Sequence, residues 1–375
     1  MKLIEIKYTD SNPSHWQLID LSLGNFNLII GENAVGKSRT VHLISSFAQM
    51  IAKQEAYIYL GKWVLSFIKE NGDILTYELD VLHPEIQREK LSINGNDVLN
   101  RDKNSTKIYS ETSKKFIKIN PPDDTLVLHV RRDKDEFPFF EDLIQWAKQV
   151  RGFKFGSIAP HTLNVDKQTD TLTSIDNIPA LLEQLNDSEY NAIINQFNSL
   201  NYELEKISIH RNPNGNRIIV YQKGMTTELN QHDMSQGMFR SLCLIIFMHY
   251  LQSKNNVSTF IIDDFCEGLD YNRAIKLGKL IVEQFANSKI QFIATTNDNF
   301  LMDVIDIKYW NILVREGSTV RSFNYQNSKE IFDDFKISGL SNFYLLSSDF
   351  LSQKQTISSY TKVKVVFGFL NFDIS

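Results

Sequence analysis

The chain has 375 residues and a formal net charge of −5, with 42% hydrophobic and 23% charged residues. This composition is typical of a globular protein with a large core, and the acidic balance excludes a protein that coats nucleic acid indiscriminately, although it leaves room for a local basic patch. No apolar run reaches the roughly 18 residues of a membrane span.

The N-terminus and the cysteines give the first predictions about location. Residues 1–7 alternate like a strand and lack the apolar core of a secretion signal. The two cysteines, Cys243 and Cys266, both lie in apolar surroundings, which predicts buried and reduced thiols. Together these features predict a cytoplasmic protein with no membrane partner.

Residues 1–30 are predicted to form two or three strands, the last of which leads into residues 31–38. This stretch reads GENAVGKS and fits the phosphate-binding pattern G-x-x-x-x-G-K-[ST]. Gly31 and Gly36 let backbone N–H groups turn toward phosphate oxygens, where a Cβ would block the approach. A nucleotide site is therefore predicted between a strand and a helix near the N-terminus.

Two side chains of this loop carry its chemistry. Lys37 is predicted to reach the β- and γ-phosphates of a nucleotide, and the Ser38 hydroxyl to ligate Mg²⁺. A helix over about 37–54 adds its positive N-terminal end to the same site. The residues that we expect to contact the nucleotide here are Gly31, Glu32, Asn33, Ala34, Val35, Gly36, Lys37, Ser38 and Arg39.

Residues 57–120 have a different sequence pattern. Apolar residues alternate with polar ones, and the pairs Asn71-Gly72 and Asn94-Gly95 are turn signals of β-hairpins. This stretch is therefore predicted to be an antiparallel β insert that packs against or presents the nucleotide base.

The region that follows is predicted to be mainly helical. A strand over 125–130 precedes helices over 139–151 and 176–205, of which the second has one apolar face. We therefore expect a helical insert over 135–210.

In the second half, residues 231–237 form a polar loop that leads into a nearly all-apolar helix over 238–251. Such a helix must be buried or lie at an interface. Ser235 is predicted to cap this helix, and Gly237 lets backbone N–H groups approach an anion. A helix over 270–287 is also predicted.

Three predicted strands end in polar groups suited to phosphate or metal. One leads into Gly31, one ends in Asp263 and Asp264, and a strand over 290–294 precedes Asn297. Because ligands of an open α/β sheet bind at the carboxyl ends of parallel strands, we expect these ends to meet over one nucleotide. Asp263 is then predicted to help hold Mg²⁺ through water, and Asp264 to orient or deprotonate the attacking water.

Towards its end the chain contains a predicted hairpin over 309–325 and a predicted helix over 328–336. Asn327 and Glu330 form a plausible capping box for that helix. An alternating run over 362–366 predicts an extra strand in the tail.

In their order and spacing, these motifs resemble the ATPase heads of the RecF/SMC class of ABC-type ATPases, and among these the compact RecF-like proteins. The class signature usually reads S-Q-G-Q-Q-R, and this chain keeps its Ser, Gln, Gly and Arg but has Met238 and Phe239 in place of the last two glutamines. The matching stretches are 31–38 (Walker A), 235–240 (signature), 261–264 (Walker B) and 267–270 (D-loop).

The resemblance implies an α/β P-loop NTPase fold, in which helices flank a mainly parallel sheet and the antiparallel β insert and a small helical lobe are added to it. We expect an ABC-type ATPase head over 1–326, within which 231–300 carries the signature, the Walker B strand and the switch region. Residues 327–375 would form a C-terminal helix and tail.

The resemblance also implies a homodimer. In this class the signature of one subunit contacts the γ-phosphate bound to the other, so ATP and Mg²⁺ lie between two copies. Residues of the second half that would contact ATP in this way are Ser235, Gln236, Gly237 and Asp270.

Two departures from the family pattern bear on catalysis. Asn297 stands where many ABC ATPases have a switch histidine; it can hydrogen-bond a phosphate or a water but cannot carry a positive charge. Asp264 stands where many relatives have the longer Glu, which makes Glu267 a second candidate for the catalytic base. Hydrolysis is therefore expected to be slow, stimulated by a partner or dispensable.

Two functions remain open. The first is a dimeric ATPase that hydrolyses ATP and acts in DNA metabolism or phage defence with an effector protein supplied in trans. The second is a nucleotide-gated scaffold without hydrolysis that controls a partner toxin or nuclease. DNA binding is possible through the basic pairs Lys114-Lys115 or Arg131-Arg132. A P-loop kinase or GTPase fits less well, because it would leave residues 235–240 unexplained.

Overall fold

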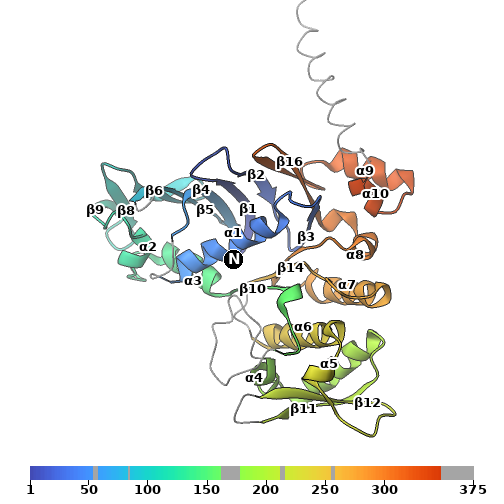
Figure 1. Ribbon diagram of the computed structural model, residues 1–375. Coiled ribbons are helices and arrows are strands. Elements are labelled where there is room, and N and C mark those ends of the chain that lie inside the picture. The colour runs from blue at the N-terminus through green and yellow to red at the C-terminus, as the bar shows by residue number, and fades with distance from the viewer. Residues whose placement is uncertain (54–57, 83–84, 162–177, 212–215, 255–257, 348–375) are drawn as a thin grey trace, which may run out of the picture.

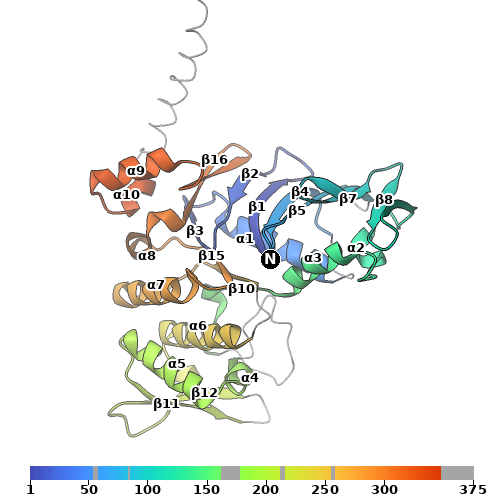
Figure 2. The ribbon, with the colours of Figure 1, turned by 180° about the vertical axis from the view of Figure 1, so that it is seen from behind.

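The structure is a computed structural model that describes residues 1–53, 58–82, 85–161, 178–211, 216–254 and 258–347. In these residues a mixed sheet of 14 strands runs through the molecule, and a sheet of three strands lies in a smaller lobe. Figures 1 and 2 show the lobe below the central strands, and the tip of the β insert at the opposite end from the C-terminal helices. Within the described residues, no helix has both the length and the apolar character needed to cross a bilayer.

Five neighbouring strands run parallel and form the centre of the large sheet. Their order is β10 (Val150–Lys154), β14 (Thr259–Asp263), β15 (Gln291–Thr295), β3 (Phe26–Gly31) and β16 (Trp310–Glu316). Their pairings are all parallel, so their carboxyl ends lie at one edge of the sheet. This arrangement confirms the prediction that the strands leading into Gly31, Asp264 and Thr295 end side by side.

Successive residues of these strands belong to two different cores, because side chains alternate between the faces of a sheet. Leu28 and Ile262 pack in the core that contains α6 (Gln236–Ser253) and α7 (Tyr271–Phe285). Ile29, Ile261 and Ile293 pack in the core that contains α1 (Lys37–Ala52) and α3 (Pro138–Lys148). Helices on both faces explain why the strands are almost continuously apolar.

The remaining strands of the large sheet pair antiparallel, apart from a short parallel contact between β17 and β2. Gly72 and Gly95 have φ of +88° and +79° at the two predicted turns, a conformation that glycine adopts without strain. The antiparallel pairings confirm the predicted strands of the insert and the predicted hairpin near the C-terminus. From β16 outward the order is β17 (Thr319–Asn324), β2 (Gln17–Ser22), β1 (Lys2–Thr9), β4 (Gly61–Ile68), β5 (Ile74–Leu82), β6 (Glu85–Ile93), β7 (Asn96–Arg101), β8 (Thr106–Ser110) and β9 (Lys115–Ile119).

The predicted helix over 176–205 is wrong in length, and the lobe is not purely helical. Asn186 and Glu189 form a capping box that starts a new helix, so that two helices replace one. Asn201, with φ of +66°, lies in the turn between the second helix and a strand. The elements of the lobe are α4 (Ile178–Leu182), α5 (Asp187–Ser199), β11 (Leu204–His210), β12 (Arg217–Gln222) and β13 (Leu229–Asn230), together with α6.

Two further predictions around residue 130 are wrong. Residues 125–130 form no strand but end in the short helix α2 (Val127–Val130), because the backbone N–H of Val127 donates to the buried Glu89 carboxylate instead of to a strand. The predicted helix over 139–151 stops at Lys148, and the next residues form β10 at the edge of the central sheet.

The C-terminal helices are α8 (Asn299–Val304), α9 (Lys329–Ser338) and α10 (Phe343–Ser347). The predicted capping box of α9 is wrong, since Ser328 is its N-cap and no side chain caps it. Asn327 instead accepts a hydrogen bond from the backbone N–H of Asn324 at 2.9 Å. The predicted strand over 362–366 lies outside the described residues. Cys243 and Cys266 are buried free thiols, as predicted, and burial raises the pKa of both.

A buried polar network ties the β insert to the chain that leads to α3. Glu89, fully buried, accepts hydrogen bonds from the Tyr77 hydroxyl at 2.8 Å and from the Val127 N–H at 2.9 Å. Arg101 lies 3.6 Å from Glu89 and donates to the carbonyl of Thr125 at 2.7 Å. Burial raises the pKa of Glu89, and these partners oppose that rise.

Replacing Arg101 with Met is expected to lower the free energy of unfolding by about 3 kcal/mol, because the Glu89 carboxylate loses its buried partner. Replacing Glu89 with Met as well should restore part of the loss. Urea unfolding followed by circular dichroism would measure both. Lys62→Met, in a surface ion pair with Asp80, is the matched control and should leave stability unchanged. An Arg101→Met protein as stable as the control would show that the network does not hold the insert.

Candidate functional site

The loop between β3 and α1 has the backbone of a phosphate cradle. Gly31 and Gly36 have φ of +152° and +113°. A Cβ on Gly31 would lie 2.6 Å from the carbonyl oxygen of Leu313, and one on Gly36 would lie 2.9 Å from Nε1 of Trp16. Both glycines are therefore required by packing as well as by the open approach of a phosphate.

Lys37 begins α1 and points back over this loop. Its Nζ donates to the carbonyl oxygens of Gly31 at 2.7 Å and Glu32 at 2.9 Å, and the residue is 6% exposed. Burial lowers the pKa of Lys37, whereas the nearby carboxylates of Asp264 and Asp263 act to raise it. Two neutral carbonyls are weak partners for a buried ammonium, so phosphate oxygens would compete with them effectively.

The predicted pair of carboxylates lies at the end of β14, next to β15. The hydroxyl of Thr295 donates to Oδ1 of Asp263 at 2.5 Å and accepts a hydrogen bond from the backbone N–H of Asp264 at 2.9 Å. Asp264 itself has φ of +52°. Thr295 thus holds the Asp263 carboxylate and the Asp264 backbone, a role that the sequence did not reveal although its position after an apolar strand was visible.

Lys154 is a site residue that the sequence analysis missed. It is the last residue of β10, where it pairs in register with Asp263, and its Nζ lies 2.8 Å from Oδ2 of Asp264. The Asp264 carboxylate raises the pKa of Lys154. The strand that carries it reads VRGFK and begins within a predicted helix, so no apolar run in the sequence marked it.

The predicted catalytic residues come together around one hollow. A cavity of about 310 Å³ is lined by Asp264, Phe265, Glu267, Asn297 and Asp298. Glu267 is exposed and lies against the loop after β10, where a Cβ on Gly156 would overlap its carboxylate. The structure therefore brings both candidate bases and the candidate switch residue to the same place.

The signature segment starts α6, on the lobe. Ser235 caps the helix, as predicted, by accepting a hydrogen bond from the Met238 N–H at 3.2 Å, and Ser235 and Gln236 are exposed. Among the described residues, no hydrogen bond or ion pair joins residues 235–237 to residues 31–39. Within one chain, the signature residues 235–237 therefore make no such contact with the phosphate loop in the part that the structure describes.

Arg240, the last signature residue, connects three segments. Its guanidinium donates to the carbonyl oxygens of Gly156 at 2.7 Å, Glu267 at 2.9 Å and Ile158 at 3.0 Å, and the residue is 8% exposed. The loop after β10 and the D-loop are therefore both held by the signature helix.

Two predicted nucleotide contacts have partners within the chain. Arg39 forms an ion pair with Asp10 at 2.7 Å and lies over the ring of Trp16. Asp270 is the N-cap of α7 and pairs with Arg273 at 2.6 Å. Either side chain would have to leave these partners to contact a nucleotide.

The donor set fits the Mg²⁺ that such a site implies. Within the described residues there is no group of three or more His, Cys, Asp or Glu side chains that could hold a metal alone. Mg²⁺ is usually bound by one or two protein groups together with phosphate oxygens and water. The exposed Ser38 at the start of α1 and Asp263 supply such groups.

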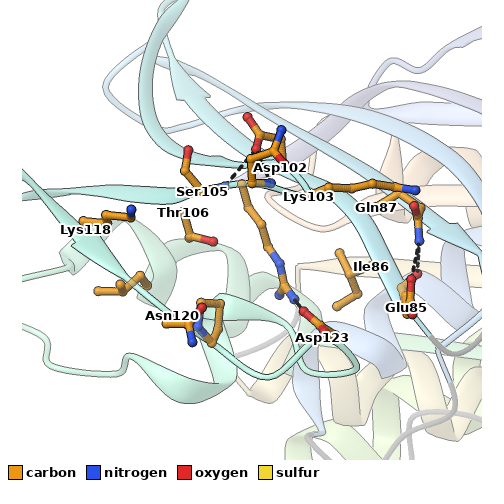
Figure 3. A pocket seen from close by; sticks show the side chains of 14 residues that line it. Glu85, Ile86, Gln87, Asp102, Lys103, Ser105, Thr106, Lys118, Asn120 and Asp123 are labelled. Carbon is orange, nitrogen blue, oxygen red and sulfur yellow. Dashed lines mark hydrogen bonds and ion pairs between the residues drawn. The ribbon is translucent and has the colours of Figure 1, made fainter.

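A second cavity lies elsewhere. It measures about 610 Å³ and lies at the far end of the β insert, between β6, β7, β9 and the loop at 120–123. Figure 3 shows polar side chains around it, among them Lys103, Lys118 and Asn120, with Asp123 at its lower edge. It contains neither the phosphate loop nor the Walker B carboxylates, so it does not extend the nucleotide site.

Solved structures of similar fold are head domains of SMC proteins. One is an SMC head bound to the C-terminal winged-helix domain of ScpA, with a TM-score of 0.53 and 13% identity over 88% of this chain and 100% of that one. Another is an SMC head with an extended coiled coil, bound to the C-terminal domain of ScpA derived from Pyrococcus furiosus, with a TM-score of 0.50 and 12% identity over 89% and 99%. At such identities the likeness shows the fold alone.

A search of curated protein sequences finds no significant match. The model of one family, described as "AAA domain, putative AbiEii toxin, Type IV TA system", matches residues 26–303, which is well over half of the chain and includes the phosphate loop, the signature and the Walker B strand. The chain therefore belongs to this family of AAA domains, and its fold is similar to that of the SMC heads.

Proposed function

We propose that this chain binds ATP with Mg²⁺, dimerises around it and hydrolyses it. The observation that carries the proposal is the meeting of the phosphate loop with the two carboxylates of β14. Lys37 is held by two neutral carbonyls of its own loop, and the charges of Asp264 and Asp263 act on it. Thr295 holds the Asp263 side chain and the Asp264 backbone at the same edge of the sheet.

Each group then has a chemical role. Backbone N–H groups of residues 31–38 and the Lys37 ammonium hold the phosphates, and Ser38 and Asp263 hold Mg²⁺, whose charge neutralises the phosphate oxygens. Asp264 orients a water whose oxygen bonds to the γ-phosphorus while the bond to the β–γ bridging oxygen breaks. ADP and inorganic phosphate result, and a proton passes through the carboxylate to solvent.

The separation of the signature from the phosphate loop supports a homodimer. Ser235 and Gln236 are exposed on the lobe, and nothing in the described part of the chain joins them to the loop at 31–39. A second copy would bring its signature to the γ-phosphate of the first. The D-loop residue Asp270 would reach the nucleotide in the same way, from the second copy.

A nucleotide-gated scaffold without hydrolysis is the second candidate. It is favoured by the ion pair between Asp264 and Lys154, which occupies the candidate base, and by the neutral Asn297 in the same hollow. In either case we propose a protein effector in trans and a role in phage defence or DNA metabolism. The SMC heads of similar fold were solved with ScpA domains bound to them, which is a precedent for a partner on such a head.

The basic pairs give little support to DNA binding. Lys114 pairs with Glu111 at 2.6 Å, and Arg132 pairs with Glu141 at 2.8 Å. Both lysine and arginine are thus engaged with neighbouring acids on the surface, as is usual for solvated charges. DNA would contact Lys114 and Arg132 only if its phosphates, with their higher charge density, displaced Glu111 and Glu141.

Lys37→Ala is expected to lower ATP turnover at least ~100-fold, because the phosphates lose their charged partner. Release of inorganic phosphate in the presence of Mg²⁺ measures the effect. The exposed Lys148→Met, at the end of α3, is the control and should match the unchanged protein. Equal phosphate release from Lys37→Ala and the control would contradict the proposed site.

Asp264→Asn should lower kcat about 100-fold or more, because water loses its base, while ATP binding is kept. The ATP-bound dimer should then accumulate, which size-exclusion chromatography with ATP would detect. Glu267→Gln is the matched comparison. A large loss of kcat with Glu267→Gln and none with Asp264→Asn would move the base to Glu267.

The composite site can be tested by mixing two inactive variants. Lys37→Ala loses the phosphate loop and Ser235→Arg blocks the signature, so each homodimer should be inactive. A mixed dimer has one intact site, and random pairing should restore about a quarter of normal turnover. No recovery, with mixed dimers shown to form by native mass spectrometry, would contradict a site shared between copies.

A further inference from the structure

Lys154 is placed where the proposed reaction develops charge. The strand that carries it, β10, is parallel to β14, so the lysine lies at the edge where the phosphate loop and the Walker B carboxylates end. Its side chain is 53% exposed, whereas that of its partner Asp264 is 18% exposed. The lysine is therefore the more accessible of the two groups, and the carboxylate is the more buried.

The distribution of charge in the site is uneven. Three carboxylates, Asp263, Asp264 and Glu267, act on Lys154. A fourth, Asp298, lines the hollow and caps α8. Lys37 is the cation of the phosphate loop, and Asn297, which also lines the hollow, carries no charge.

Binding of ATP changes this balance. A γ-phosphate with its charge would attract Lys154 more strongly than the single carboxylate of Asp264, since phosphate offers several acceptor oxygens. The Lys154 ammonium, 2.8 Å from Oδ2 of Asp264, also competes with the attacking water for that carboxylate oxygen. The observed pair and the proposed hydrolysis therefore use Asp264 in two incompatible ways.

We propose that Lys154 exchanges Asp264 for the γ-phosphate when ATP binds, and that it supplies the positive charge that Asn297 lacks. This inference rests on the proposed ATPase function. Asp264 is released to orient water, and Lys154 stabilises the charge on the γ-phosphoryl oxygens as the bond to the bridging oxygen breaks. Without the γ-phosphate, as with ADP, the lysine returns to Asp264.

Two consequences distinguish this role from simple support of Asp264. Lys154 would strengthen the binding of ATP but not of ADP, because only ATP has the group that it contacts. It would also stabilise the transition state, so that its loss lowers kcat. A lysine that only positioned Asp264 would change kcat and leave the preference for ATP over ADP unaltered.

The test compares the affinities for ATP and ADP in Lys154→Met, Lys154→Arg and the control Lys148→Met. Equilibrium dialysis with labelled nucleotide and Mg²⁺ gives both dissociation constants, and phosphate release gives kcat and KM. We expect Lys154→Met to lose about 10- to 100-fold in the preference for ATP over ADP and a comparable factor in kcat. Lys154→Arg should keep most of both, because it retains the charge.

An unchanged ATP-to-ADP preference in Lys154→Met, or an equal loss of affinity for both nucleotides, would overturn the exchange of partners. The same conclusion would follow if Lys154→Arg lost as much as Lys154→Met, or if thermal unfolding showed that both substitutions only destabilise the fold. Lys154→Gln serves as a second neutral variant. If the unaltered protein bound ATP without hydrolysing it, the proposed hydrolysis would fail, while the affinity comparison would still decide the role of Lys154.

Discussion

The site depends on the parallel alignment of four buried strands, β10, β14, β15 and β3, whose carboxyl ends share one edge. Helices on both faces exclude water from these strands and fix their register. The position of Thr295 depends on that register, and its hydroxyl links the side chain of Asp263 to the backbone of Asp264. A shift of β15 by one residue would turn the hydroxyl to the other face and release the Asp263 carboxylate and the Asp264 backbone.

The signature helix adds a second constraint. Arg240 donates to carbonyl oxygens in the loop after β10 and in the D-loop, so the lobe is coupled to the residues around Asp264 through main-chain atoms. Movement of the lobe would therefore displace the loop that directly follows Lys154 and the loop that carries Glu267. In the proposed dimer, this coupling would link a second copy at Ser235 to the residues around Asp264.

Two lysines carry positive charge at the site. Lys37 belongs to the phosphate loop and is nearly buried, while Lys154 comes from a different strand and is half exposed. In the proposed function the first binds phosphate, and the second responds to it. Asn297, which lines the hollow beside Asp264, is neutral and supplies no positive charge of its own.

Short-range patterns in the sequence determined the phosphate loop, the carboxylates of β14, the cap of α6 and the antiparallel insert, because spacing, turn residues and apolar runs act over a few positions. The tertiary structure alone decided what depends on distant pairing. It placed the short helix α2 within 125–130 through the buried Glu89, and it ended the helix before β10 by adding that strand to the sheet. It also brought Lys154 to Asp264 across 110 positions of chain. No local pattern encodes such contacts, since they depend on which strands become neighbours.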